Sequence, residues 1–310
     1  MMDNIMEKIT VVGSSNTDMI MQLDKIPRPG ETLLGNKFST AAGGKGANQA
    51  VGAARAGGNV NFIASIAADL FGDTAVEGFI KEGIDTTYIS RESNNPSGAA
   101  FIFIDKSGEN SIGVASGSNF DLSPHIIDNA IDSIAESEVI LTQLETPLNT
   151  VEHLAKIVNS QKSSTFILNP APAQKLSNEL LKMIDIITPN ETEAEELTGI
   201  QIKGSEDAKI ACLKLHDAGV KTVIITMGEK GAFLSTESAQ NLIPTFKVAP
   251  VDTTGAGDIF NGVLAVGVSK KQDLENAVRF ANAAAALSVT VLGAQPSAPI
   301  LESINDMFKS

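Results

Sequence analysis

Short apolar runs rich in β-branched residues recur along the chain, and longer stretches with helical periodicity separate them. Runs of this length predict buried strands, and the stretches between them predict helices. Strands are expected at 8–14, 60–66, 99–105, 139–145, 165–170, 185–190 and 222–228, with helices at 47–57, 147–160 and 205–219. This alternation predicts an α/β fold with a mainly parallel central sheet and helices on both faces.

Two further segments do not fit the alternation, because each contains strand-like pieces around a turn instead of a helix. Segment 17–42 carries the turn sequence RPGE, and segment 96–117 carries KSGEN. Loops of this length without secondary structure are uncommon in compact domains. We therefore expect a single α/β domain over 1–310, with a small β-sheet lid built from approximately 17–42 and 96–117. Two long surface loops are the alternative.

Polar residues follow the predicted strands at the points where the strands end. In open parallel sheets, ligands bind beyond the carboxyl ends of the strands. The residues in these positions are Asn16, Asp18, Glu145, Asn169, Asn190, Glu193, Thr226 and Gly228. The sequence therefore predicts a binding site along this edge of the sheet.

Composition narrows the choice of ligands. The chain has 310 residues, of which 43% are hydrophobic, and a net charge of -14 without a run of Lys or Arg. A protein that binds nucleic acid by its phosphates needs a basic face, so nucleic acid is not an expected partner. A single cysteine excludes a disulfide framework. The start of the chain lacks the apolar core of a signal peptide, and no tract is apolar enough to span a bilayer. We expect a soluble cytoplasmic protein with no membrane partner.

The common phosphate-binding and nucleophile motifs are absent. The P-loop pattern fails because Lys45 is followed by Gly46, and neither the dinucleotide fingerprint nor a G-x-S-x-G elbow occurs. Two glycine-rich loops remain, at 41–46 and 252–257, and each opens a predicted helix.

The second of these loops, DTTGAGD at 252–258, combines an anion site with an acid. Successive backbone N–H groups in Gly255, Ala256 and Gly257 at a helix start can converge on an anion, assisted by the helix dipole. An acid adds nothing to anion binding, but it can accept a proton from a hydroxyl that attacks a bound phosphate. Asp258 is therefore a candidate general base. The alternative is an ordinary acidic residue in a first helical turn.

Three other segments have both a structural and a functional interpretation. In the loop at 41–57, glycines permit close backbone approach to a ligand and Lys45 adds a positive charge, but the loop could also be only a tight connection. Asn190 and Glu193 have the spacing of a capping box, and they could instead face phosphates and a hydrated Mg²⁺. The sequence TMGEKG at 226–231 is either a hairpin turn or a nucleotide-contacting loop.

Taken together, these segments resemble a known family. AAGGKGANQAVGAARAG at 41–57 and DTTGAGDIFNGVLA at 252–265 resemble the two signature segments of the ribokinase-like (PfkB) family of carbohydrate kinases. NETE and TMGEKG resemble further family elements, and the likeness extends to GAQPSAP near the carboxyl terminus. The resemblance implies transfer of the γ-phosphoryl group of ATP to O5 of D-ribose. It also implies Mg²⁺, a potassium ion as activator, and a homodimer formed through the β lid.

The resemblance also assigns roles to residues. Asp258 would be the catalytic base, and the amides of Gly255, Ala256 and Gly257 would form the anion hole. The sugar would be bound by Asn16, Asp18, Gly44, Lys45, Asn48 and Glu145. ATP would be bound by Asn190, Thr226, Gly228, Gly231 and Asn282, with Mg²⁺ on the phosphates near Glu193. The potassium ion would be bound by the Asp252 carboxylate, the carbonyls of Thr254, Ser288, Val291 and Gly293, and the Ser297 hydroxyl, and it would order the anion-hole loop.

Several interpretations stay open beside this one. Another sugar kinase of the family, acting on deoxyribose, fructose or another ketose, is the nearest alternative. A nucleoside kinase would need stacking surfaces, whereas the chain has one Tyr and no Trp; a non-catalytic sugar sensor would not need Asp258. Position 67 is alanine where the family usually has glycine in its GxDxxG element, which could alter the backbone near the sugar. An aspartate with a pKa near 4 is a weak base, so alignment and charge stabilisation would supply most of the rate enhancement.

Overall fold

The main sheet of the computed structural model has nine strands in the order β13–β12–β11–β10–β9–β8–β1–β4–β5. Neighbouring strands from β11 to β5 are parallel, and β12 and β13 add an antiparallel edge. The strands are β1 (Lys8–Val12), β4 (Asn59–Ser65), β5 (Ile89–Ser90), β8 (Val139–Thr142), β9 (Thr165–Leu168), β10 (Ile186–Ile187), β11 (Thr222–Thr226), β12 (Ala232–Ser235) and β13 (Gln240–Ile243). The expectation of a mainly parallel sheet is confirmed.

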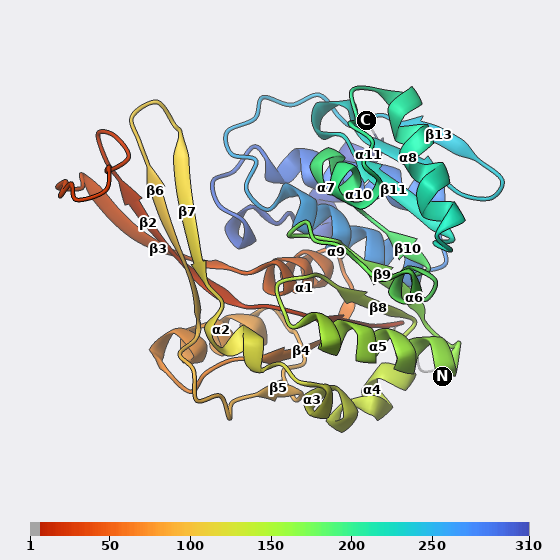
Figure 1. Cartoon of the computed structure of the whole chain (residues 1–310), viewed down its shortest axis with the longest axis horizontal. Helices are drawn as coiled ribbons and strands as arrows, with labels where there is room; N and C mark the ends of the chain where they lie inside the picture. The colour runs from red at the N-terminus through yellow and green to blue at the C-terminus, as the bar shows by residue number, and fades with distance from the viewer. Residues whose placement is uncertain (1–6, 310) are drawn as a thin grey trace.

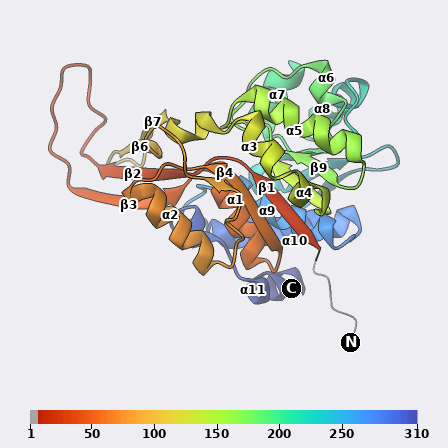
Figure 2. The same ribbon diagram turned by 90° about the horizontal axis from the view of Figure 1, so that it is seen from below.

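Helices cover both faces of this sheet, and each face has its own hydrophobic core (Figures 1 and 2). One face packs against α1 (Lys45–Arg55), α2 (Leu70–Lys81), α9 (Ala256–Ser269), α10 (Leu274–Ser288) and α11 (Leu301–Lys309). The other packs against α3 (Pro124–Asn129), α4 (Ile131–Ala135), α5 (Leu148–Gln161), α6 (Asn178–Leu181), α7 (Glu191–Thr198) and α8 (Ser205–Asp217). The three-layer arrangement follows from strands that are apolar on both sides.

Helices α1 and α9 pack with their backbones in contact. A Cβ atom on Gly262 of α9 would overlap the carbonyl oxygen of Gln49 and would lie 2.8 Å from the nitrogen of Ala53. On the α1 side, a Cβ on Gly52 would lie 3.2 Å from Cδ1 of Ile259. Small residues on both helices therefore allow a separation that larger side chains would prevent, and the start of α1 is brought against the start of α9.

A second, smaller sheet extends from one end of the main body (Figure 1). Its order is β3–β2–β6–β7, with β2 and β6 parallel and the two outer pairs antiparallel. The strands are β2 (Asn16–Gln22), β3 (Lys37–Gly43), β6 (Gly98–Ile104) and β7 (Asn110–Ala115). This is the small β sheet expected from the two segments outside the alternation, and we call it the lid sheet.

The structure describes residues 7–309, so residues 1–6, on which part of the signal-peptide prediction depends, lie outside it. Within the described range, no helix combines the length and the apolar character needed to cross a bilayer. Short 3₁₀ helices complete the chain: η1 (Gly117–Asp121), η2 (Gly228–Lys230) and η3 (Gln295–Ser297).

Candidate active site

Helix α9 begins at the second glycine-rich loop. Gly255 is its N-cap with φ 74°, and a Cβ there would lie 2.6 Å from the Cβ of Ala294, so glycine is required. The first N–H groups of a helix have no partner within the helix, and they carry the positive end of its dipole. The Ala256 N–H makes one long turn bond of 3.3 Å to the Thr253 oxygen. The loop therefore offers the N–H groups that an anion site requires.

Asp258 lies in the first turn of α9, and both of its carboxylate oxygens are held by helix α1. Asn48 donates to Oδ2 over 2.9 Å, and Gln49 donates to Oδ1 over 3.0 Å. The aspartate is 7% exposed. It is not an N-cap residue, since its side chain accepts no bond from its own helix in these contacts. The two amides fix the orientation of a nearly buried carboxylate at the mouth of the anion loop.

Burial raises the pKa of Asp258 above its usual value, and the charge of Glu145 raises it further. Lys45 and the two amide donors lower the pKa, but burial and the charge of Glu145 together outweigh them. The assumption that this acid has a pKa near 4 is therefore wrong. A carboxylate that loses water to burial binds a proton more tightly, which makes Asp258 a stronger base toward a hydroxyl than a surface aspartate.

Further carboxylates, Asp18 and Glu145, lie close enough to Asp258 to act on one another. Burial raises the pKa of Asp18 to about 6, with smaller contributions from the charges of Glu145 and Asp258. Oε2 of Glu145 accepts from the Ser14 hydroxyl over 2.6 Å and from the Lys45 N–H over 3.0 Å. The sequence placed these carboxylates at different strand ends, and the fold brings them to one site.

Lys45 supplies the positive charge among these acids. Burial lowers the pKa of its ammonium group, but the charges of Asp258, Glu145 and Glu193 outweigh burial and raise it overall. Gly44 is the N-cap of α1 beside it. Oδ1 of Asn48 is buried without a hydrogen-bond partner. A buried amide oxygen of this kind is costly unless a ligand satisfies it, so Asn48 has one contact available for a polar ligand.

The capping interpretation of Asn190 and Glu193 is confirmed. The Asn190 side chain accepts from the Glu193 N–H over 2.8 Å, and Glu193 accepts from the Asn190 N–H over 2.8 Å. The Glu193 carboxylate is also nearly buried, and burial raises its pKa despite the nearby charge of Lys45. Glu193 thus belongs to the same electrostatic group as Lys45 and Asp258. Its capping role does not remove it from the site.

The remaining residues assigned to the nucleotide lie at the antiparallel edge of the sheet. Thr226 ends β11 and forms a bridge with Asn190. Gly228 and Gly231 belong to the turn that joins β11 to β12, so TMGEKG is a hairpin turn. The Asn282 amide donates to the carbonyls of Ile243 and Pro244 over 3.0 and 3.4 Å. Its Oδ1 atom remains for other contacts.

Asp252 joins the two segments that the resemblance assigned to a monovalent cation. Oδ1 accepts from the Thr254 N–H over 2.9 Å, and Oδ2 accepts from the Gly293 N–H over 2.8 Å. Burial raises the pKa of Asp252, but hydrogen bonds from the Thr254 side chain and from the Gly293 and Thr254 N–H groups outweigh burial and lower it, so the group stays ionised. The Ser297 hydroxyl donates to the Ala294 oxygen over 2.7 Å and keeps its lone pairs. The family resemblance adds oxygens of Thr254, Ser288, Val291, Gly293 and Ser297 to this ionised carboxylate, and such a set would suit a hard cation.

Helix α1 holds the second of these segments through Arg55. Its guanidinium donates to the carbonyls of Gln295 and Ala298 over 3.0 and 2.9 Å. The same group forms a two-bond ion pair with Glu82, at 2.6 and 2.9 Å. The turn that carries Ser297 is therefore fixed to α1, the helix that also positions Asp258.

Behind Asp258 lies a chain of buried polar side chains, of which only Asn169 was named from the sequence as a residue at the strand ends. The amide of Gln49 also donates to Oδ1 of Asn169, and its oxygen accepts from Gln143 over 2.7 Å. Asn261 donates to the Gly257 carbonyl over 2.8 Å and accepts from the Thr188 hydroxyl. These bonds connect the anion loop to the ends of β8, β9 and β10. A signal for Gln49 was available: it follows Asn48 in the first turn of α1.

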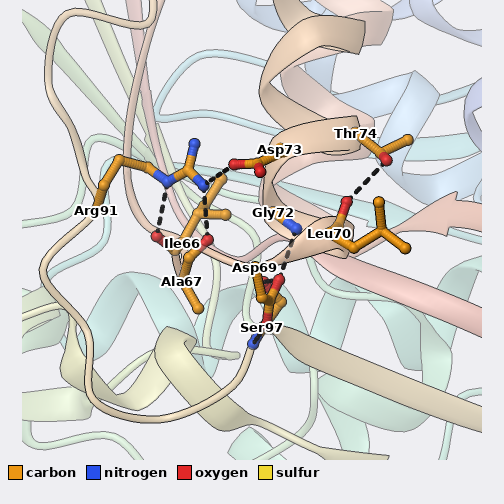
Figure 3. A network of polar contacts seen from close by, with 9 residues as sticks. All are labelled: Ile66, Ala67, Asp69, Leu70, Gly72, Asp73, Thr74, Arg91 and Ser97. Atoms are coloured by element: carbon orange, nitrogen blue, oxygen red, sulfur yellow. Dashed lines mark hydrogen bonds and ion pairs between the residues drawn. The ribbon is translucent and has the colours of Figure 1, made fainter.

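Ala67, which stands where the family usually has glycine, does not strain the backbone. Among the described non-glycine residues, only Lys162 and Lys271 have positive φ. Ala67 is 4% exposed, and its carbonyl accepts from Arg91 over 2.8 Å (Figure 3). Asp69, the acid of this element, caps α2 through the Gly72 N–H and also accepts from the N–H and the hydroxyl of Ser97 (Figure 3). Asp69 therefore ties α2 to the start of the lid strand β6.

Comparisons with known proteins agree with this geometry. The model of the pfkB family carbohydrate kinases matches residues 6–301. A ribokinase of Haemophilus influenzae is 48% identical over 291 residues, covering 94% of this chain and 95% of the relative. A deoxyribokinase of Salmonella typhi is 38% identical over 299 residues, covering 96% and 97%. The structure of an Arabidopsis thaliana ribokinase complexed with ribose and ATP superposes with a TM-score of 0.92 at 33% identity, covering 99% of this chain and 100% of that one. The chain belongs to the pfkB family of carbohydrate kinases.

Proposed function

We propose that this chain is a ribokinase, which transfers the γ-phosphoryl group of ATP to O5 of D-ribose and releases ADP. The observation that carries the proposal is the fixed Asp258 carboxylate at the amide-rich start of α9, surrounded by Asp18, Glu145 and Asn48. Relatives named ribokinase, 48% and 39% identical over most of the chain, support ribose as the acceptor.

In this reaction Asp258 accepts the proton of the attacking sugar hydroxyl. Its raised pKa allows that transfer to begin earlier than it would with a surface aspartate. The N–H groups of Gly255, Ala256 and Gly257, together with Lys45, stabilise the charge that develops on the transferring phosphoryl group. The sugar would be held by Asn16, Asp18, Gly44, Lys45, Asn48 and Glu145. The buried unpaired oxygen of Asn48 is one of the acceptors available to it.

ATP would be bound along the edge formed by Asn190, Thr226, Gly228, Gly231 and Asn282. Mg²⁺ would supply charge neutralisation on the β- and γ-phosphates. The Glu193 carboxylate fits this ion through ordered waters, because both of its oxygens already accept bonds from Asn190. Its position within reach of the charge of Lys45 keeps it beside the same phosphates.

A potassium ion would fit the oxygen donors around Asp252, where it would fix the loop that precedes Gly255. Asp252→Ala removes the ionised carboxylate and both of its backbone contacts. We expect potassium stimulation of turnover to fall by about tenfold in this variant. A potassium-dependent rise in melting temperature, measured without substrates, should be lost as well. An unchanged potassium response in both measurements would reject the site.

The lid sheet would be covered by a second copy of the chain, giving a homodimer. Strand β7 is exposed along its whole length, and Phe38, Phe101, Ile112 and Val114 of the lid sheet are all exposed large hydrophobic residues. The strand register places Phe38 and Phe101 on one face of the sheet and Ile112 and Val114 on the other, the face of Asp18. Exposed apolar side chains on so small a sheet are typical of an interaction surface.

Substrate preference tests the proposal directly. The same coupled ADP-release assay is run with D-ribose, 2-deoxy-D-ribose, D-fructose and adenosine, at saturating ATP, Mg²⁺ and K⁺. We expect the highest kcat/KM with D-ribose. Relatives named deoxyribokinase make 2-deoxy-D-ribose the sharpest competitor. A preference for any other acceptor would overturn the assignment of ribose, and the absence of turnover with all four would overturn kinase activity on these acceptors.

A further inference from the structure

Asn119 lies beside the sugar site but was not among the residues expected to form it. It is part of η1 and is 1% exposed. Its Oδ1 accepts from the Ser15 N–H over 2.8 Å, and its Nδ2 donates to Oδ1 of Asn16 over 2.7 Å. It therefore contacts the residue that begins the lid strand β2 and the residue before it.

These two bonds fix the direction of the Asn16 amide. A backbone N–H can only donate, so the oxygen of Asn119 must face Ser15 and its NH₂ group must face Asn16. The oxygen of Asn16 then accepts that bond, and its own NH₂ group turns the other way. Among the described residues, no hydrogen bond is made by Nδ2 of Asn16. Asn16 thus presents a donor instead of an acceptor.

The surrounding site is rich in acceptors. Asp18, Glu145 and Asp258 supply carboxylates, and the buried oxygen of Asn48 is unpaired. A sugar hydroxyl has one hydrogen to donate. When a carboxylate accepts that hydrogen bond, the hydroxyl oxygen can still accept a bond from a separate donor. A neutral donor at Asn16 complements the carboxylates, whereas an amide oxygen in the same place would repel the hydroxyl oxygen.

Asn119 has little freedom to move, because the start of β6 covers it. A Cβ on Gly98 would overlap both Nδ2 of Asn119 and Oδ1 of Asn16. The turn before Asn119 is fixed by the Ser118 N–H, which donates to the Pro96 oxygen over 2.8 Å. Ser97, which lies between Pro96 and Gly98 in the sequence, donates its N–H and its hydroxyl to Asp69 (Figure 3). The position of Asn119 is thus set by the contacts that attach the lid sheet to α2.

We propose that Asn119 is a positioning residue of the sugar site, which orients the Asn16 amide so that Asn16 donates to a sugar hydroxyl. The proposal rests on the proposed sugar kinase function. Asn119 does not touch the substrate; it acts through Asn16.

The test is a double-mutant cycle on sugar binding, measured by calorimetry with D-ribose in the absence of ATP. Asn119→Asp is close in shape and still accepts from Ser15, but it replaces the donor to Asn16 with an acceptor. Asn16 must then turn its NH₂ group toward position 119 and its oxygen toward the sugar. We expect the Kd for ribose to rise by about tenfold or more. The KM for ATP should change by less than about twofold, because Asn119 is remote from the nucleotide residues.

The cycle separates positioning from general damage. In an Asn16→Ala background, Asn119→Asp should cause no further loss of ribose affinity, because the residue through which it acts is missing. Lowering the pH should partly restore binding in the single variant, since the introduced carboxyl group can again donate once it is protonated. Asn129→Asp, an exposed change of the same kind on α3, should leave ribose binding unchanged.

Each outcome decides the proposal. An unchanged Kd in Asn119→Asp, or an equal loss in the Asn16→Ala background, would overturn it. If Asn119→Asp does not fold, the same cycle is run with Asn119→Ala, in which the freed Asn16 amide should weaken binding by a few-fold. If the unmodified chain binds no ribose, the proposed substrate fails first, and that result is visible before any variant is made.

Discussion

The main sheet and the lid sheet differ in how they are stabilised. Strands of the main sheet are covered by helices on both faces, and residues such as Val11 and Leu141 have no exposed surface. The lid sheet has no such cover: β7 is exposed throughout, and Ile112 remains 55% exposed. A sheet with both faces buried is held by the hydrophobic effect, whereas the lid sheet depends on its backbone pairing and on its attachment to the body.

The proposed sugar site joins these two regions. Asp258 and Asn48 come from helices of the body, whereas Asn16 and Asp18 come from the first lid strand. In the proposed function, proton transfer therefore takes place on the helices of the body, and part of the substrate binding takes place on the less covered lid sheet. Changes in the body should affect stability or turnover strongly, and changes in the lid sheet should affect binding and assembly.

The largest expected effect is a loss of stability in the body. Phe62 of β4 is fully buried and packs edge-to-face on Phe79 with ring centroids 5.2 Å apart. We expect Phe62→Ala to lower the free energy of unfolding by about 3–5 kcal/mol. Phe101→Ala in the lid sheet, where the ring is 48% exposed, should cost less than about 1 kcal/mol. Urea denaturation of both variants measures the two changes in the free energy of unfolding. Equal changes would contradict the difference between the main sheet and the lid sheet.

The next effect is on turnover. Asp258→Asn keeps the shape of the side chain but removes the base, so kcat should fall by roughly 10²-fold or more. Ribose binding, measured by calorimetry, should weaken much less than kcat falls, because the contacts of Asn16 and Asp18 are unchanged. Only the bond from Asn48 or Gln49 to position 258 is disturbed. Asp217→Asn on the exposed end of α8 is the matched control. A variant at position 258 with near-normal turnover would show that Asp258 is not the base.

A smaller effect concerns pH and the lid residue Asp18. Its pKa in the folded chain is raised from 3.8 to about 6, so the folded state binds this proton more tightly than the unfolded state. The stability that Asp18 contributes is present below about pH 4 and is lost as the pH rises through about 6. We expect Asp18→Asn to be more stable than the unmodified chain by about 1 kcal/mol at pH 8, with the difference shrinking toward pH 4. Melting curves of both proteins from pH 4 to 8 show whether the stability difference grows with pH. A difference that stays constant over this range would contradict the prediction.

The smallest effect on stability should come from the exposed lid strand β7. Ile112→Asp changes a side chain that is already 55% exposed, so the folded monomer should lose less than about 0.5 kcal/mol. The assembly should respond instead, because the change places a charge in the surface that the proposed homodimer would bury. We expect light scattering to report a dimer for the unmodified chain and a monomer for the variant. Leu213→Asp, on the exposed side of α8, is the control and should remain dimeric.

The two regions also differed in how far the sequence predicted them. Runs such as VILT at β8 and TVIIT at β11 predicted the parallel strands, because strands buried on both faces are continuously apolar. Turn signals and strand-like pieces predicted the lid sheet. The antiparallel edge strands β12 and β13 were missed, since AFLS contains no β-branched residue and QNLI begins with two polar residues, so neither forms an apolar β-branched run.

The site could be proposed from the sequence where a motif suggests its chemistry, as at Asp258, whose role as the base stays a prediction. It was not predictable where a residue acts through buried contacts between distant segments. Gln49 and Asn119 are examples: the partner of Gln49 at Asp258 is 209 positions away, and that of Asn119 at Asn16 is 103 positions away. Neither residue type is unusual for a helix or a turn, so their roles depend on the fold itself.

The glycine contact between α1 and α9 has a consequence for motion during the catalytic cycle. Gly262 packs directly against the backbone of α1. The two helices therefore lack an intervening layer of side chains at this point, and without such a layer they cannot slide past each other. Asp258 and its two amide partners must then travel as one rigid unit. When the site opens to admit a sugar or release a phosphorylated product, the lid strands would therefore move, and the orientation of the Asp258 carboxylate would stay the same.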